Sequence, residues 1–595
     1  MRYSIAGNLK YIWKKEFSWY HQLRYLFPLR IIVSCIYPII ETAIPALVVS
    51  IVSKQEGGKK LVIYLCGSLL LCLVLSVLRD YATQWVDKMW AWCRCQNFNQ
   101  MLIRNAMEKD YCLLEQEEMQ TKMSMAARAI GRNYDGIEGM TRSFDQLLIG
   151  VVGIIGYTGI IVSMDIRIFL VLVLMCIVNV FLSKKASEYL KKHSEEDAKV
   201  SKQCDYLYRT MTDYRDIKDI ILFRMSTWFC DEFDKLCNKK RKINNNIEKV
   251  WSYPEISDAI FMGLKDGVAY YILIGGVLAG NISIAMFTFY IGIINGFSGW
   301  LFQIVGAIGD LKRDNILVNS FREVVIEHEQ NSVVRENAKD SSHQKMGIKF
   351  DKVSFTYASG EQKVLDNISF EIEAGEKIAL VGENGAGKST LIKILTGLYK
   401  NFDGEVWIGS KKYNADTVKD FSWDDVTVVY QDSVLLAFSV GENIACKPWN
   451  QVDETRVERT LKKIGLHKKI SQLPQGIHTR ISKIIDRNGV DFSGGEGQKL
   501  LLARSLYQDG NIIILDEPTS ALDPIAEKKL YEDFSDLVNG RTAIFVSHRL
   551  ATTKFCDRTI VLKRGLVIEE GTHDELMKKQ GEYARMYQAQ SKYYK

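Results

Sequence analysis

The chain has 595 residues, 47% of them hydrophobic, and a formal net charge of +6. A soluble protein of this length would consist of several domains, but here the apolar residues gather in long uncharged runs. The small positive charge is typical of loops at an anionic membrane surface and does not indicate a nucleic-acid partner. The 12 cysteines have no metal-ligand spacing and are expected to be reduced thiols.

The first half of the chain contains runs that are long enough to cross a bilayer, which takes about 20 apolar residues per helix. Four runs are clear, a fifth is interrupted by Glu41 and two prolines, and a sixth must extend back across Lys265 and Asp266. A soluble helical bundle is the alternative, but buried helices of soluble proteins rarely run so long without charge. We therefore expect an all-α membrane domain of six long helices over residues 1–320. Its expected spans are residues 31–53, 61–79, 146–164, 166–183, 261–280 and 284–309.

Two long polar excursions lie between these spans, Arg79 to Gln146 and Lys184 to Asp258. Lys and Arg residues are concentrated in them. Positive residues favour the cytoplasmic side of a membrane. This predicts a multi-pass cell-membrane protein with both termini in the cytoplasm. A polar linker is expected over residues 321–346, followed by a second domain over residues 347–595.

The second domain begins with a glycine-rich loop between a strand and a helix. An apolar run ends at Gly382, and apolar residues recur at helical spacing after Thr390, which is the context that a phosphate-binding loop requires. Lys388 would reach the β- and γ-phosphates of a nucleotide, and Ser389 would ligate Mg²⁺. A chance glycine turn is the alternative. The expected nucleotide contacts in this loop are Gly382, Asn384, Gly385, Gly387, Lys388, Ser389 and Thr390.

A second motif follows a fully apolar strand-like run, Ile512 to Leu515, which ends in Asp516 and Glu517. Asp516 is placed to hold the Mg²⁺ of the same site, and Glu517 is placed to polarise the attacking water. Phosphoryl transfer needs mainly positioning and charge stabilisation, so a base beside a metal suits that reaction.

Further motifs occur in a fixed order: Tyr430-Gln431, Phe492-Ser493-Gly494-Gly495-Glu496, Ser520 to Asp523, and Ile544 to His548. With them, residues 347–595 resemble the nucleotide-binding domain of an ABC transporter, an α/β P-loop ATPase domain with a helical subdomain. The six spans with two long excursions resemble the exporter type of this family. The resemblance implies ATP and Mg²⁺ as cofactors.

The resemblance also assigns roles to single residues. Tyr357 would stack on adenine, Gln431 would sense Mg²⁺ and water, His548 would contact the γ-phosphate, and Asp523 would act across a dimer. The expected catalytic residues are thus Glu517, His548 and Gln431, and the expected metal ligands are Ser389, Gln431 and Asp516. Residues 492–496, here called the signature segment, would contact the nucleotide of a partner subunit through Ser493, Gly494, Gly495 and Glu496.

Glu496 departs from the family pattern, which has Gln at this position, and its carboxylate could repel a nucleotide. In this fold the signature segment lies too far from its own phosphate loop to reach the same ATP, so two domains must meet head to tail. Because Lys388, Ser493 and Glu517 are all of the types that catalysis requires, a homodimer of half-transporters is the simpler expectation. A heterodimer with a degenerate partner remains open.

In an exporter, the excursions would turn at short coupling helices, expected near Cys112 to Glu115 and Cys204 to Tyr208.

The expected function is ATP-driven export of a peptide or an amphipathic small molecule. A lipid flippase and a non-transporting ABC ATPase that gates or signals are the alternatives. Charged residues in the spans either line a polar cavity for cargo or, through Lys265 and a neighbouring acid, lock helices together. These residues are Glu41, Asp258, Lys265 and Asp266.

Overall fold

The computed structural model describes most of the chain as two compact units. One comprises Met1–Glu108 and Thr121–Ser332, and the other comprises Lys109–Gln120 and Val333–Lys595. The described residues are 3–591, except for 56, 165, 330–345, 358–359, 361, 419–422, 424, 519–537, 539 and 548. The expected linker is helical as far as Glu329, where α11 ends, and most of its remainder lies outside the described residues.

The first unit is built from helices. They are α1 (Ile5–Trp19), α2 (Leu23–Ser53), α3 (Gly58–Trp92), the π-helical η1 (Cys93–Phe98), α4 (Asn99–Glu108), α6 (Glu117–Gly131), α7 (Gly136–Met164), α8 (Ile166–Thr212), α9 (Tyr214–Leu222), α10 (Ser226–Leu278) and α11 (Ile284–Glu329). Within the part of the chain that the structure describes, six helices are long and apolar enough to cross a membrane. They begin at Leu23, Gly58, Gly136, Ile166, Ser226 and Ile284.

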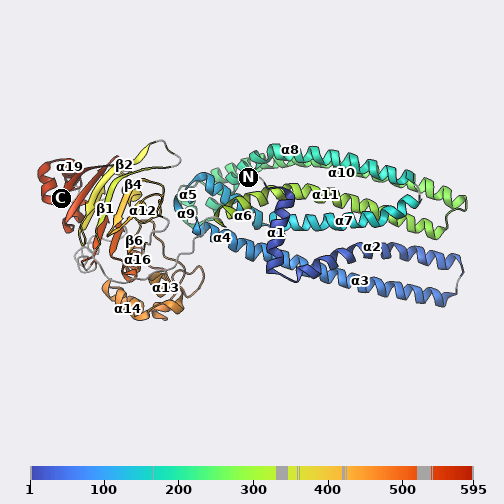
Figure 1. Ribbon diagram of the computed structural model, residues 1–595, viewed down its shortest axis with the longest axis horizontal. Coiled ribbons are helices and arrows are strands. Elements are labelled where there is room, and N and C mark those ends of the chain that lie inside the picture. The colour runs from blue at the N-terminus through green and yellow to red at the C-terminus, as the bar shows by residue number, and fades with distance from the viewer. Residues whose placement is uncertain are drawn as a thin grey trace. The chain divides into compact units, whose positions relative to one another are not determined.

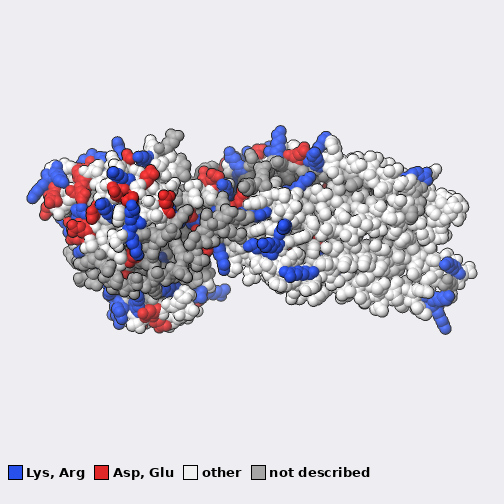
Figure 2. Space-filling view, viewed as in Figure 1, with Lys and Arg blue, Asp and Glu red and all other residues white. Residues whose placement is uncertain are grey.

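The outer surfaces of these helices are apolar rather than polar. Large side chains such as Leu70, Ile155 and Leu170 are more than half exposed, and in the view of Figure 2 the middle of this unit is almost free of charge. Only a helix or a closed barrel satisfies every backbone hydrogen bond in lipid. The predicted six-helix membrane fold is confirmed, and the chain is a multi-pass membrane protein.

Four of the long helices pack in pairs, α8 with α10 and α7 with α11 (Figure 1). The expected turn at Cys204 to Tyr208 is wrong, because these residues lie inside α8. Cys204 is buried there against Ile243 of α10, so the helix continues to gain apolar contact beyond the predicted turn. The chain turns instead at Asp213, and the short helix α9 follows.

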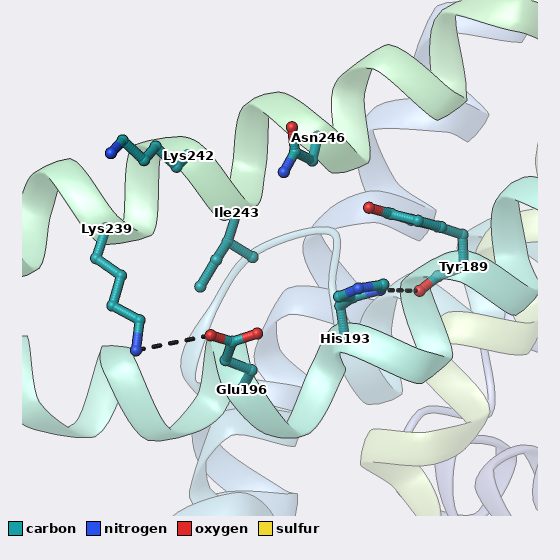
Figure 3. A pocket seen from close by; sticks show the side chains of 7 residues that line it. All are labelled: Tyr189, His193, Glu196, Lys239, Lys242, Ile243 and Asn246. Carbon is teal, nitrogen blue, oxygen red and sulfur yellow. Dashed lines mark hydrogen bonds and ion pairs between the residues drawn. The ribbon is translucent and has the colours of Figure 1, made fainter.

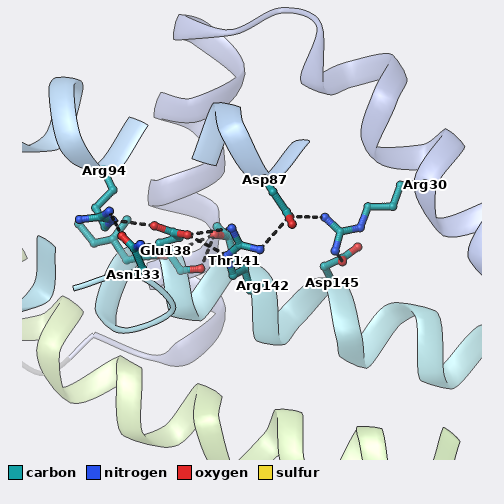
Figure 4. Close-up of polar contacts among 9 residues, drawn as sticks. Arg30, Asp87, Arg94, Asn133, Glu138, Thr141, Arg142 and Asp145 are labelled. Carbon is teal, nitrogen blue, oxygen red and sulfur yellow. Dashed lines mark hydrogen bonds and ion pairs between the residues drawn. The ribbon is translucent and has the colours of Figure 1, made fainter. Parts of the chain in front are cut away.

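A chain of buried ion pairs joins α2, α3, η1 and α7 (Figure 4). Glu138 accepts hydrogen bonds from Arg94 at 2.6 Å and from Arg142 at 2.9 Å. Asp87 lies 2.8 Å from both Arg142 and Arg30, and Arg30 lies 3.0 Å from Asp145. Each buried carboxylate thus has a guanidinium partner, as burial of charge requires.

The second unit contains two sheets (Figure 1). The strands are β1 (Ile348–Thr356), β2 (Lys363–Ile372), β3 (Lys377–Gly382), β4 (Asp403–Ile408), β5 (Lys411–Tyr413), β6 (Val426–Val429), β7 (Ile512–Asp516), β8 (Thr542–Val546), β9 (Arg558–Lys563) and β10 (Leu566–Gly571). One sheet has the order β2-β1-β4-β5 and is antiparallel. The other has the order β10-β9-β3-β8-β7-β6, and only β10 runs antiparallel to its neighbour.

Helices pack against these sheets in three groups. They are α5 (Tyr111–Leu114), α12 (Lys388–Leu395), α13 (Val440–Ala445), α14 (Glu454–Lys463), α15 (His467–Ser471), α16 (Gly494–Gln508), α18 (His573–Lys579) and α19 (Glu582–Ser591). α12 packs in one hydrophobic cluster with the four-stranded sheet. The helices α13 to α16 pack in a second cluster, on the side of the six-stranded sheet that carries β6 and β7. The third group is α18 and α19, with Leu576 and Tyr583 in a cluster with Ala379 and Val381 of β3. This is the predicted α/β domain with a helical subdomain.

The ion-pair chain generates a prediction about the stability of the membrane unit. Replacement of Glu138 by Ala leaves two buried guanidinium groups without their shared carboxylate, and we expect a loss of about 3 kcal/mol of unfolding free energy. Thermal unfolding of the purified protein in detergent measures this loss. The matched control is Glu232→Ala, which breaks an exposed pair with Lys235 and should change the melting temperature far less. Equal melting temperatures for the two variants would contradict a stabilising role of the buried chain.

Candidate functional site

The phosphate loop is formed by residues 383–387, between the end of β3 and the start of α12. Gly387 has a φ of +102°, and a Cβ atom there would lie 2.6 Å from Cδ2 of Leu365. A Cβ atom at Gly382 would lie 2.2 Å from the carbonyl oxygen of Leu562. Both positions therefore require glycine for steric reasons. Asn384 and Gly385 lie at the exposed tip of the loop.

Lys388 is enclosed by this loop and is 5% exposed. Its Nζ atom donates hydrogen bonds to the carbonyl oxygens of Gly382 at 2.8 Å and of Glu383 at 3.1 Å. Burial lowers the pKa of Lys388, and the nearby charges of Glu517 and Asp516 oppose this shift. The loop thus presents a cation and the N-terminus of α12 at one place, which is an arrangement that binds phosphate. Ser389 is exposed in the first turn of the helix, and Thr390 is buried.

The two acids at the end of β7 lie beside this loop, because β8 pairs in parallel with both β3 and β7. Asp516 is 5% exposed, and burial together with the charge of Glu517 raises its pKa to about 6. Glu517 has a φ of +50° and donates its backbone N–H to the carbonyl oxygen of Val546 at 3.0 Å. A left-handed conformation is uncommon outside glycine and is concentrated at functional sites.

Tyr357 follows the end of β1 and belongs to an aromatic group with Phe355 and Tyr399. Its hydroxyl lies 3.2 Å from Oγ1 of Thr390 in the phosphate-loop helix. Gln431 is exposed in the turn after β6. The preceding residue, Tyr430, is linked through its hydroxyl to Oγ1 of Thr396 at 2.5 Å, which fixes this turn to the end of α12.

The signature segment begins α16. The Ser493 side chain accepts a hydrogen bond from the backbone N–H of Glu496, and Glu496 Oε2 accepts one from the Ser493 N–H at 3.1 Å. This reciprocal pair is a capping box, in which Glu or Gln usually occupies the third helical position after the N-cap residue. Glu496 Oε1 also accepts a hydrogen bond from Lys469 at 2.5 Å, and this bond is the main reason that the pKa of Glu496 is lowered. The carboxylate expected to repel nucleotide is thus balanced by Lys469, a partner that the sequence did not indicate.

The phosphate loop and the signature segment belong to different cores of the same unit. Leu391 and Ile394 of α12 lie in the cluster with the four-stranded sheet, whereas Leu500 of α16 lies in the other cluster, against which Phe492 packs. The structure brings Lys388, Asp516 and Glu517 together but does not add Ser493 to this group. His548 and Asp523 lie outside the described residues, so their expected roles stay predictions.

The first unit has a small cavity of about 260 Å³ between α8 and α10 (Figure 3). Lys239 and Glu196 form an ion pair across it at 3.6 Å, and His193 Nδ1 lies 3.0 Å from the carbonyl oxygen of Tyr189. Because these polar groups contact one another, we interpret the cavity as a gap between two helices. Among the described residues, no group of three or more His, Cys, Asp or Glu side chains could hold a metal ion.

Comparison with known proteins agrees with this geometry. Residues 365–520 match the protein family described as ABC transporter. A solved structure described as a bacterial Atm1-family ABC exporter with ATP bound has a TM-score of 0.75 with this chain at 21% identity. That match covers 96% of this chain and 99% of the other. The chain thus belongs to the class of proteins in which a P-loop nucleotide-binding domain is fused to six candidate membrane spans. The C-terminal unit carries the ABC transporter domain, and the chain has the fold of an ABC exporter.

Curated relatives match shorter parts of the chain. The ATP-dependent lipid A-core flippase of Cupriavidus pinatubonensis is 36% identical over 243 residues, 40% of each chain. CydD of Bacillus subtilis, a glutathione/L-cysteine transport system ATP-binding/permease protein, is 38% identical over 244 residues, 41% of each chain. The subtilin transport ATP-binding protein SpaT of Bacillus subtilis is 28% identical over 396 residues, 65% of this chain and 61% of SpaT. The matches span less than two thirds of each relative.

The steric limits in the phosphate loop give a prediction. Gly387→Ala adds a clash with Leu365 to a strained φ, so we expect the affinity for nucleotide to fall at least about tenfold. Gly385→Ala is the matched control, because Gly385 also has a positive φ but has no atom within 4 Å of an added Cβ. It should weaken binding less. Titration of the full-length protein with a fluorescent ATP analogue measures both affinities, and equal losses would show that the contact with Leu365 is unimportant.

Proposed function

We propose that this protein is an ATP-driven exporter that works as a dimer of half-transporters in the cytoplasmic membrane. The placement of the phosphate loop and the signature segment on different cores of one unit carries this proposal. A signature segment that does not join its own phosphate loop is available to the nucleotide of a second subunit. Two ATP molecules would then lie between the two nucleotide-binding domains, each held by residues of both.

Phosphoryl transfer at such a site needs an aligned water and a balance of charge. Glu517 would accept the proton of the attacking water, and its position is fixed by the backbone hydrogen bond to Val546. Lys388 and the first N–H groups of α12 would hold the phosphate oxygens. Gln431 would contact the water from the turn after β6, and Tyr357 would stack on adenine. Closure of the two domains on ATP would draw the membrane helices together, and hydrolysis would release them.

Mg²⁺ fits the residues beside the phosphate loop. Asp516 is a buried carboxylate whose pKa is raised by burial and by the negative charge of Glu517, against the opposing charge of Lys388, so a bound cation would stabilise its ionised form. The Asp516 carboxylate and the Ser389 hydroxyl would hold the ion, together with Gln431. Carboxylate and hydroxyl oxygens are ligands that Mg²⁺ prefers, with phosphate and water completing its shell. When bound, the ion supplies charge neutralisation at the phosphates.

We propose that both termini lie in the cytoplasm, because ATP is supplied there and the excursions are rich in Lys and Arg. The homodimer is favoured over the heterodimer, because Lys388, Gln431, Ser493 and Glu517 are all present in this one chain.

The contacts of Lys265 decide between its two predicted roles, which are lining a cavity for cargo and holding helices together. Its Nζ atom donates to Oδ1 of Asn295 in α11 at 2.8 Å and pairs with Asp266 at 3.0 Å, and the side chain is fully buried. These contacts support the interpretation that Lys265 locks α10 to α11 rather than contacting cargo. Glu41 lies in α2, where it is exposed, and Asp258 lies in α10.

We propose a peptide or an amphipathic small molecule as cargo, with lipid as the second candidate. The match to SpaT, a protein named for subtilin transport, is 396 residues long and therefore extends beyond the 249 residues from 347 to 595. The flippase matches of about 250 residues are no longer than this domain, but their names favour lipid as the alternative.

Stimulation of ATP hydrolysis in liposomes by labelled lipid or by peptide distinguishes the two cargo candidates. ATP hydrolysis without flux of either would favour a gating or signalling ATPase.

The role of Glu517 predicts that Glu517→Gln stops ATP turnover, with a fall of at least about a hundredfold, while nucleotide binding is retained. The amide keeps the size of the side chain but cannot accept the proton. Release of phosphate by the protein in nanodiscs measures turnover, and retention of labelled ATP measures binding. Glu454→Gln, an exposed change at the start of α14, should leave turnover unchanged. Normal turnover in Glu517→Gln would remove this residue from its role.

The shared site predicts complementation between two inactive variants. Lys388→Ala should inactivate the phosphate loop of its own chain, and Ser493→Arg should block the nucleotide of the partner. A mixed dimer of the two chains therefore contains one damaged and one intact ATP site, whereas each variant alone contains none. We expect the doubly tagged and doubly purified mixed dimer to regain hydrolysis and each pure dimer to have none. A mixed dimer as inactive as its parents would exclude a site built from both subunits.

A further inference from the structure

A short segment of the N-terminal half belongs to the same compact unit as the nucleotide-binding domain. Lys109–Gln120 includes the four-residue helix α5, and Tyr111 and Cys112 pack against the hydrophobic cluster that contains α12. The ring of Tyr111 is stacked with that of Tyr399 at a centroid distance of 6.5 Å. This segment therefore touches the structural elements that form the nucleotide site.

Glu115, directly after α5, makes two charge-assisted hydrogen bonds in this interface. Its Oε1 accepts from Nζ of Lys393 at 2.9 Å, and its Oε2 accepts from the hydroxyl of Tyr399 at 2.5 Å. Lys393 lies in α12, the helix that starts with Lys388, and Tyr399 is fully buried. Burial alone would raise the pKa of Glu115, but the hydrogen bonds from Tyr399 and Lys393 outweigh it and hold the pKa below its usual value.

The contacts continue from Tyr399 to the residue expected to stack on adenine. The hydroxyl of Tyr399 lies 3.5 Å from that of Tyr357, which lies 3.2 Å from Oγ1 of Thr390. The ionised carboxylate of Glu115 can only accept hydrogen bonds, so Tyr399 must give it its single hydroxyl proton. The oxygen of Tyr399 is then left to accept from Lys393, 3.2 Å away. Tyr399 contacts Tyr357 through the edge-to-face packing of the two rings, whose centroids lie 5.8 Å apart, and through the 3.5 Å approach of their hydroxyls. The charge on Glu115 therefore sets the direction of the hydrogen bonds that Tyr399 makes with Glu115 and with Lys393.

We propose that Glu115 is a positioning residue for ATP. Through Tyr399 it holds the ring of Tyr357, and through Lys393 it holds α12, in the arrangement that binds nucleotide. A movement of residues 109–120 would then change the contacts of the protein with adenine and with the phosphates at the same time, and with them the affinity for ATP. This inference rests on the proposed function, since it requires that ATP binds at Lys388 with adenine on Tyr357.

A second ion pair of the same segment provides the matched control. Asp110 pairs with Lys400 and so also fastens residues 109–120 to the domain. No hydrogen bond among the described residues links this pair to Tyr357 or to α12. If Glu115 merely docked the segment, loss of either acid would have similar consequences for ATP hydrolysis.

The first experiment compares Glu115→Gln with Asp110→Asn in the full-length protein in nanodiscs. We expect Glu115→Gln to raise the KM for ATP about fivefold with a smaller change in kcat, because a charge-assisted hydrogen bond is lost on the binding side. Asp110→Asn should leave KM within about twofold of the original value, and Glu115→Asp should restore part of the affinity. A KM for Glu115→Gln that equals the original value, or that of Asp110→Asn, would overturn the proposal.

A double-mutant cycle with Tyr357→Phe tests the path itself. This change keeps the aromatic ring but removes the hydroxyl that contacts Tyr399 and Thr390. If Glu115 acts through that hydroxyl, Glu115→Gln should raise KM less in the Tyr357→Phe background than in the original protein. Fully additive changes would show that no such path exists.

The proposed function can fail separately from this inference. If the unmodified protein does not hydrolyse ATP, the exporter proposal fails. If hydrolysis is normal and is lost in Glu517→Gln, but Glu115→Gln does not change KM, only the positioning role of Glu115 fails. Melting temperatures of all variants show whether a raised KM comes from a loss of folding.

Discussion

Val546, the last residue of β8, joins the two halves of the nucleotide site. It is the register partner of Leu380 in β3 on one side and of Asp516 in β7 on the other. Its carbonyl oxygen also accepts the N–H of Glu517. The phosphate loop follows β3 and the acids end β7, so this one strand sets the position of the cation relative to the acids. A slip in either pairing would separate Lys388 from Glu517.

Much of this architecture was predictable from sequence because it depends on local patterns. Long uncharged runs identified six spans, and the order of strand, glycine loop and helix identified the phosphate loop. The acids after Ile512 to Leu515 could be placed because a buried parallel strand ends at the same edge of the sheet as its neighbours. These features need only composition, spacing and the chain order of motifs.

The features that sequence did not show are contacts between distant segments. Lys469 balances Glu496 across 27 positions, and Glu115 meets Lys393 across 278. A charged residue in a long polar excursion has no periodic signal that names its partner. The misplaced turn near Cys204 has the same origin, since only packing against α10 shows that α8 continues. The capping box at Ser493 and Glu496 is different, because its two residues are three positions apart and a local sequence pattern could have identified it.

The two carbonyl groups that hold Lys388 change how the arrival of a nucleotide should be understood. The ammonium group already donates hydrogen bonds to the carbonyl oxygens of Gly382 and Glu383, so its hydrogen-bonding capacity is partly used before a ligand binds. Capture of phosphate becomes an exchange, in which internal acceptors are traded for external ones and the net gain is only their difference. The same carbonyl oxygens would be available to accept hydrogen bonds from the ammonium group again once the phosphates had left.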